Sequence, residues 1–135
     1  LVGRTAEKLE QVKRELDDPD TFTFAGAGAP SPIIGPIDGL SPYEASGVPL
    51  GIARNIPYSD RVVPFPPGTN LCLYSDALVE SPDAEGGMLD VPVVIELMCD
   101  HAGSAQPLPD MVERFRGSRV EIGDDLTVLW IRRES

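Results

Sequence analysis

Residues 71–81 read LCLYSDALVES, a strand-like apolar run that reaches an acid, Asp76, at the point where the chain turns polar. Short runs of apolar and aromatic residues bounded by turn residues are typical of β-strands. A strand that only fills a core more often ends at an uncharged turn residue, whereas an acid at the end of a rigid strand can bind a cation. Asp76 is therefore the first candidate site residue.

Further strands are predicted upstream of this run. Thr and Phe alternate over residues 21–24, and the small residues and prolines that follow predict a tight corner before a second short strand near residues 33–34. VVPF at 62–65 is another strand candidate, and PPGTN at 66–70 contains Pro67-Gly68, which favours a chain reversal. We therefore expect residues 62–75 to form a β-hairpin.

Three helices are predicted. Residues 2–16 carry an apolar stripe at helical spacing. A second helix follows Asp90 as N-cap, with Pro92 in its first turn and Gly103 after its end. A third spans residues 107–117. The side chains expected to face the core in the second helix are Val93, Val94, Leu97 and Met98. The apolar side chains of the third helix are Met111, Val112 and Phe115.

The chain closes with a Gly-Asp-Asp corner and a strand in which Leu126, Val128 and Trp130 alternate with Thr127, Leu129 and Ile131. The order of elements is helix, several strands, two helices and a strand. This order predicts an α+β fold with a mainly antiparallel sheet.

Composition limits the classes of function. The 135 residues predict a single domain, residues 1–135, and 41% hydrophobic content is enough for a core. The net charge of −11 argues against nucleic acid as a partner. No apolar run reaches about 18 residues, so no membrane span is expected. Cys72 and Cys99 lie in apolar segments, which predicts buried reduced thiols and a cytoplasmic protein.

Two acidic corners form the candidate site. Asp76 follows one strand, and Asp124 with Asp125 precedes another. If these strands are antiparallel neighbours, the corners meet at one rim of the sheet. Clustered carboxylates repel unless a cation lies between them, and hard oxygen ligands favour Mg²⁺ or Mn²⁺. On spacing alone, the alternative that these aspartates cap backbone N–H groups is stronger.

The order of motifs is more specific than any one motif. It comprises TFTFAGAGAPSPII (21–34), GVPLGI (47–52), Tyr58, VPFPPGTNLCLYSDALVES (63–81) and GDDLTVLWIRR (123–133). This series resembles the C-terminal half of bacterial metal-dependent type-2C (PPM) serine/threonine protein phosphatases. The most similar branch is that of sporulation stage II protein E and the sigma-factor regulator phosphatases.

The resemblance implies an antiparallel β-sandwich with flanking helices, incomplete in this chain. It also implies two Mn²⁺ or Mg²⁺ ions that activate a shared water for attack on a phosphoserine or phosphothreonine. Asp76 and Asp124 match metal ligands of the family, and Asp125 matches a neighbour that orders the corner. Glu80 matches a family glutamate, although a solvated loop acid is an equal alternative. The implied partner is a phosphorylated regulatory protein, such as an anti-anti-sigma factor.

The chain departs from the family in three places. No Asp-x-x-Gly-His-Gly-like motif, which supplies another metal aspartate, is present; Gly28 replaces a usual His, and Ala77 replaces a Gly. Two explanations follow: a portion of an active phosphatase that is inactive alone, or a degenerate, non-catalytic interaction module. A plain acidic structural domain is a third option. His101, the only histidine, is expected to be a surface or helix-end residue.

Overall fold

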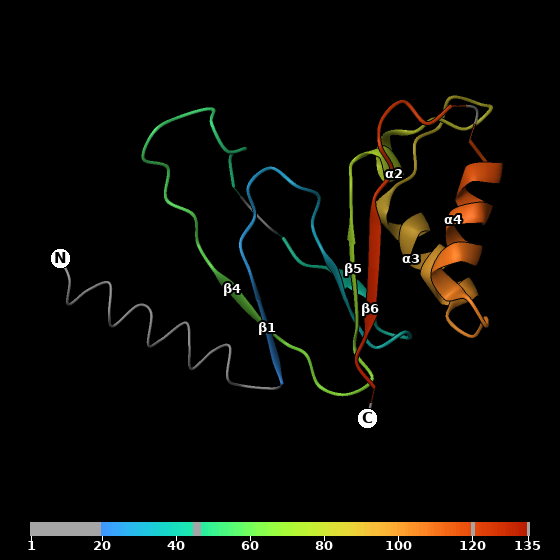
Figure 1. Cartoon of the computed structure of the whole chain (residues 1–135), viewed down its shortest axis with the longest axis horizontal. Helices are drawn as coiled ribbons and strands as arrows, with labels where there is room; N and C mark the ends of the chain where they lie inside the picture. Colours follow the sequence, from blue (N-terminus) through green and yellow to red (C-terminus); the bar gives the residue numbers. More distant parts are fainter. Residues whose placement is uncertain (1–19, 45–46, 120, 135) are drawn as a thin grey trace.

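The computed structural model describes residues 20–44, 47–119 and 121–134 (Figure 1). The helix expected at residues 2–16 lies outside these ranges. The elements are β1 (Thr21–Phe24), β2 (Ile33–Gly35), β3 (Ser41–Pro42), β4 (Arg61–Pro64), β5 (Asn70–Tyr74), α2 (Ala77–Glu80), α3 (Val91–His101), α4 (Pro107–Gly117) and β6 (Val128–Arg132). The strands and helices expected within the described ranges are therefore present.

The described strands form two antiparallel sheets. One contains β1 and β4, and the other has the strand order β3-β2-β5-β6. Strand β5 is interior to the larger sheet, and four of its five residues are buried. Its nearly continuous apolar sequence fits this position, because a strand covered on both faces needs no polar side.

The predicted hairpin over residues 62–75 is wrong. Strand β4 pairs with β1, with Phe22 opposite Val63, while β5 pairs with β2 and β6. The turn itself exists, since Gly68 has a φ of 87° and Thr69 N–H donates to Pro66 O at 3.1 Å. Pro64 still pairs with Thr21, and Phe65 N–H donates to Asp20 O at 2.7 Å. Pro66 and Pro67 have no N–H to donate, so the pairing stops there and the turn leads into the other sheet.

Helices α3 and α4 cover one face of the four-stranded sheet (Figure 1). Asp90 caps α3 as expected, accepting a hydrogen bond from Val91 N–H at 2.8 Å. Val94 and Met98, four residues apart, face the sheet, but Val93 is 37% exposed, so its expected core position is wrong. Val93 lies off the helix stripe defined by the i, i+4 pair. No helix in the described ranges has the length and apolar character to cross a bilayer.

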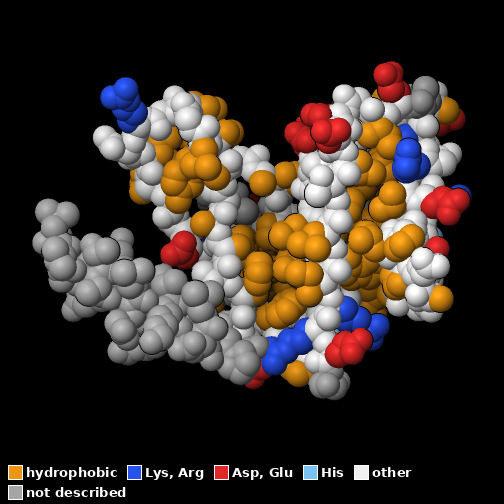
Figure 2. Space-filling view, in the orientation of Figure 1, with side chains coloured by type: hydrophobic (Ala, Val, Ile, Leu, Met, Phe, Trp, Pro, Cys, Tyr) orange, Lys and Arg blue, Asp and Glu red, His pale blue; other side chains and the backbone are white. Residues whose placement is uncertain are grey.

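Two apolar clusters hold the layers together. Between the helices and the larger sheet lie Ile33, Cys72, Tyr74, Leu78, Leu89, Val94, Met98, Met111 and Phe115. Between the two sheets lie Ile34, Val63 and Leu71, with Phe22, Phe24, Phe65 and Leu73 packed against them. The arrangement is the predicted antiparallel β-sandwich with flanking helices. Hydrophobic side chains also gather in the hollow between β1–β4 and β6 (Figure 2).

The two cysteines are free thiols with different environments. Cys72 is fully buried, as predicted, whereas Cys99 is exposed, so its expected burial is wrong. The Cys99 thiol donates to Ile37 O at 3.2 Å, a bond that joins α3 to the connection between β2 and β3. Burial raises the pKa of the Cys72 thiol from 9.0 to about 12. Burial, and secondarily Cys72, also raises the pKa of Tyr74.

The Cys72 shift predicts alkaline destabilisation. Below pH 9.0 the thiol is protonated in both states, but above it only the unfolded chain loses the proton. The free energy of unfolding therefore falls as pH rises from about 9 to about 12. In urea unfolding from about pH 7 to about pH 11, the free energy of unfolding of Cys72→Val should fall less steeply than that of the wild type. Part of the fall should remain in the variant, because the pKa of Tyr74 is also raised. Equal slopes for the two proteins would contradict the assigned role of Cys72.

Candidate metal site

The pairing of β5 with β6 brings the two acidic corners together. Tyr74 lies opposite Val128 at one end of the ladder. Asp76 comes just after β5 and Asp124 just before β6, so both lie at this rim of the sheet. Both side chains line one pocket of about 260 Å³. The other lining residues are Ala77, Glu80, Ser81 and Gly123. The structure thus shows the convergence on which the sequence hypothesis depends, and metal binding at this pocket stays a prediction.

Ser75 ties the two corners to each other. Its backbone N–H donates to Thr127 O at 2.9 Å, and its hydroxyl donates to Asp125 O at 2.9 Å. The same hydroxyl oxygen accepts from Thr127 N–H at 3.0 Å. These bonds extend the β5–β6 pairing past the last paired residues. Sequence reasoning missed Ser75, because a serine after a strand is common and its partners lie about fifty positions away.

Each candidate ligand also caps the backbone that follows it. Asp76 Oδ1 accepts from Ala77 N–H at 3.0 Å, and Asp124 Oδ1 accepts from Asp125 N–H at 2.7 Å. Both aspartates therefore cap backbone N–H groups, as the alternative to metal binding predicts. Within the described residues, no hydrogen bond engages Oδ2 of either side chain. Capping fixes each carboxylate and leaves one oxygen of each for a ligand.

Asp125 contributes its backbone to the site. Its backbone N–H donates to Asp124 Oδ1, and its backbone carbonyl accepts from the Ser75 hydroxyl. The Asp125 side chain is not among the residues that line the pocket. This geometry agrees with the expected role of ordering the corner rather than binding directly.

Glu80 and Ser81 form another wall of the pocket. Glu80 ends the short helix α2, so it lies on a helix at the pocket and not in a loop. Ser81 is buried, and its hydroxyl donates to Ala77 O at 2.6 Å. Glu80, although exposed, therefore lines the same pocket as the two aspartates.

Arg119 braces this wall from beyond the end of α4. Its Nη1 donates to Ser81 O and to Gly87 O, both at 3.2 Å. Its guanidinium also lies over the Phe115 ring, 5.5 Å from the centroid. Nothing in the local sequence could have indicated this, because the contact joins a loop to a residue nearly forty positions later.

The side chains that line this pocket supply only part of a ligand set for a hard divalent cation. Carboxylate oxygens are the ligands that Mg²⁺ and Mn²⁺ prefer. Among the described residues, no group of three His, Cys, Asp or Glu side chains is placed to hold a metal ion. Asp76 and Asp124 can therefore supply part of a ligand set, and a complete set needs further donors.

The departures from the family pattern have local explanations. Asn55 is the only non-glycine residue of the described chain with positive φ, so Ala77 adopts no conformation that requires glycine. Gly28 has a φ of 88°, and a Cβ there would lie 2.4 Å from Pro49 Cγ. A histidine at position 28 would therefore require the segment around Pro49 to move. His101 donates from Nδ1 to Leu97 O at 2.8 Å within α3, away from the acidic pocket.

A sequence profile for stage II sporulation protein E (SpoIIE) matches residues 16–134. The chain belongs to the SpoIIE family. No curated protein sequence gives a significant match.

Solved structures share the fold of this SpoIIE-family chain. The SiaA PP2C domain of Pseudomonas aeruginosa has a TM-score of 0.68 at 23% identity, covering 85% of this chain and 47% of that one. The structure of the RsbU and RsbW domains of Mycobacterium tuberculosis Rv1364c has a TM-score of 0.72 at 24% identity, and the match covers 85% of this chain and 33% of that one. The Bacillus subtilis SpoIIE phosphatase domain with a fragment of its regulatory domain has a TM-score of 0.68 at 19% identity, and the match covers 84% of this chain and 34% of that one.

These likenesses show a PP2C-type fold. The chain spans less than half the length of each of these three solved chains. The predicted resemblance to the SpoIIE branch, and to part of a type-2C phosphatase fold, is thereby confirmed.

The Ser75 bonds generate a stability prediction. Ser75→Ala removes two hydrogen bonds between the corners and should lower the free energy of unfolding by about 1–2 kcal/mol. Ser75→Thr keeps the hydroxyl and should retain most of that stability. Urea unfolding of the two variants beside the wild type measures the difference. If Ser75→Ala is as stable as wild type, the hydroxyl does not join the corners.

Proposed function

We propose that this chain is part of a metal-dependent protein phosphatase domain that removes phosphate from phosphoserine or phosphothreonine. The observation that supports the proposal most directly is the convergence of Asp76 and Asp124 on one pocket. The family membership and fold support the same reaction class.

Electrostatics require a cation before this pocket can accept a phosphate. Three acidic side chains, those of Asp76, Glu80 and Asp124, line it in a chain with a net charge of −11. A phosphoryl group would be repelled by these carboxylates unless positive charge lay between them. Bound Mn²⁺ or Mg²⁺ supplies that charge and Lewis-acid stabilisation of phosphoryl oxygens.

The residues of this chain would act by holding and orienting. Asp76 and Asp124 would hold the cation through their Oδ2 atoms, because their Oδ1 atoms are bonded to the backbone. Ser75 keeps the two corners at a constant separation. In the complete active site, we propose that donors from outside the described residues finish a two-ion ligand set.

The proposed substrate is a phosphorylated regulatory protein of the anti-anti-sigma type, and the proposed location is the cytoplasm. The matched proteins include RsbU, RsbW and SpoIIE domains, which supports a regulatory setting for this chain too. The two free thiols are compatible with a reducing compartment.

A non-catalytic interaction module is the second candidate. Two observations favour it: no three-ligand metal group lies within the described ranges, and Gly28 sits in a corner that excludes a side chain. Such a module would bind its partner without hydrolysis and without need of a metal.

Turnover by the full-length protein separates the two candidates. With Mn²⁺ and a phosphoserine substrate protein, Asp124→Asn should lower kcat/KM by about a hundredfold or more, because transition-state charge loses its cation. Asp100→Asn, an equal charge change on the exposed side of α3, should leave kcat/KM unchanged. Phosphate release is measured with and without chelator.

Two results would contradict this account. One is full phosphate release by Asp124→Asn, which would remove Asp124 from the metal site. The other is binding of the phosphoprotein that chelator does not alter, with no phosphate release under any metal condition. The second result would support the interaction module.

A further inference from the structure

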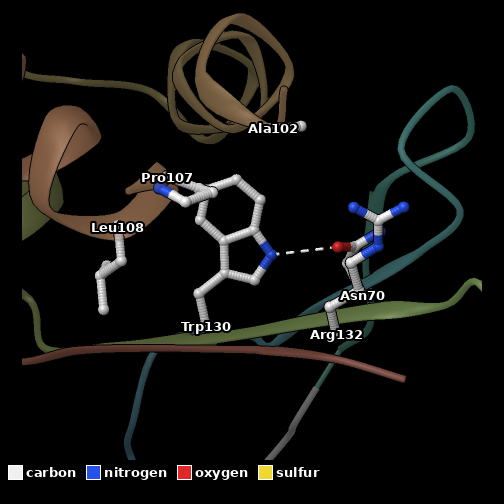
Figure 3. A pocket seen from close by; sticks show the side chains of 6 residues that line it. All are labelled: Asn70, Ala102, Pro107, Leu108, Trp130 and Arg132. Carbon is white, nitrogen blue, oxygen red and sulfur yellow. Dashed lines mark hydrogen bonds between the residues drawn. The ribbon is translucent and has the colours of Figure 1, made fainter. Parts of the chain in front are cut away.

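A second pocket lies at the opposite end of the β5–β6 pair from the acidic site. Asn70 is paired with Arg132 at that end of the ladder, whereas Tyr74 and Val128 mark the acidic end. The pocket has a volume of about 150 Å³. Its walls are Asn70, Ala102, Pro107, Leu108, Trp130 and Arg132 (Figure 3). The end of α3, the start of α4 and the sheet thus meet around it.

Trp130 forms the apolar centre of this pocket. Its indole projects from β6 toward Pro107 and Ala102, and its Nε1–H donates to Asn70 Oδ1 at 3.1 Å (Figure 3). Asn70 is only 3% exposed, and its amide nitrogen donates to Gly35 O at 3.4 Å. The indole is therefore fixed in orientation with its polar atom satisfied. What it presents to a ligand is a flat apolar face.

Arg132 supplies a positive charge beside that face. Its guanidinium lies on the Asn70 side of the indole, opposite Pro107 and Leu108 (Figure 3). Arg132 is exposed and has no ion pair or hydrogen-bond partner among the described residues. Its neighbour Arg133, by contrast, pairs with Asp20 at 2.9 Å. An unneutralised guanidinium in a chain of net charge −11 favours an anionic ligand, and a carboxylate matches its two-donor geometry.

The wall opposite Arg132 is held in place before any ligand binds. Ser104 donates its hydroxyl to the Asp110 carboxylate, which joins the α3–α4 connection to the first turn of α4. The Ser104 hydroxyl oxygen also accepts from Gln106 N–H at 3.0 Å, directly before Pro107. A preformed wall lowers the entropy lost on binding.

The pocket is open to solvent on one side and has room for about one six-membered ring, since an enclosed apolar cavity of similar volume, about 150 Å³, accepts benzene. We propose that it binds a small single-ring aromatic carboxylate, with the ring against the Trp130 indole and the carboxylate on Arg132. This site is separate from the acidic pocket and does not depend on the phosphatase proposal.

Trp130 is the only tryptophan of the chain, so its fluorescence reports on this pocket alone. Phenylacetate should change that fluorescence saturably, with a Kd of about 1 mM or lower. Phenylacetamide has the ring without the charge and should bind about tenfold more weakly, and acetate should cause no change. Amide shifts by NMR for residues 102–108 and 130–132 give a second readout of the same titrations.

Variants separate the two halves of the site. Arg132→Gln should weaken phenylacetate about tenfold and leave phenylacetamide unchanged. Ala102→Leu should fill the pocket and abolish binding of both, while Arg54→Gln removes a charge from an exposed loop arginine and should change neither. The proposal is overturned if acetate binds as well as phenylacetate, if Arg132→Gln has no effect, or if the amide shifts lie outside these segments.

Discussion

The antiparallel pairing of β5 with β6, continued by Ser75 beyond the ladder, is the constraint on which this structure depends. Five residue pairs join the two strands from Asn70–Arg132 to Tyr74–Val128. Because the strands run in opposite directions, the end of one lies beside the start of the other. One end of the pair then carries Asp76 and Asp124, and the other carries Asn70 and Arg132, with Trp130 at the middle of the ladder. Both candidate sites follow from one pairing.

The acidic rim shows how an aspartate that caps the backbone can keep one carboxylate oxygen available. A carboxylate has two oxygens, and a backbone N–H engages only one of them. In Asp76 and Asp124 the bond to the next residue fixes the side chain without consuming Oδ2. A rigid, short carboxylate is what a metal site needs, because ordering a free side chain on binding costs free energy. Here the cap does that ordering during folding.

Sequence patterns predicted those parts of the fold that are determined locally. The alternation in β1 and β6, the Asp90 cap and the apolar stripe of α4 each depend on residues close in sequence. The pairing of β4 with β1 was missed because a Pro-Gly turn between two strand-like runs favours a hairpin locally. Pro66 and Pro67, which cannot donate to a ladder, were the available signal. The bonds of Ser75 and Arg119 join distant segments, so no local pattern could reveal them.

Manganese-induced relaxation in ¹⁵N-labelled protein tests the central claim most directly. A paramagnetic ion broadens the amide signals nearest to it, so substoichiometric Mn²⁺ should first broaden residues 75–77 and 123–125. Asp124→Asn should remove this broadening, and Asp100→Asn should retain it. Broadening centred instead on the loop acids Asp83 and Glu85, or spread evenly over the acidic surface, would contradict a shared cation site between Asp76 and Asp124.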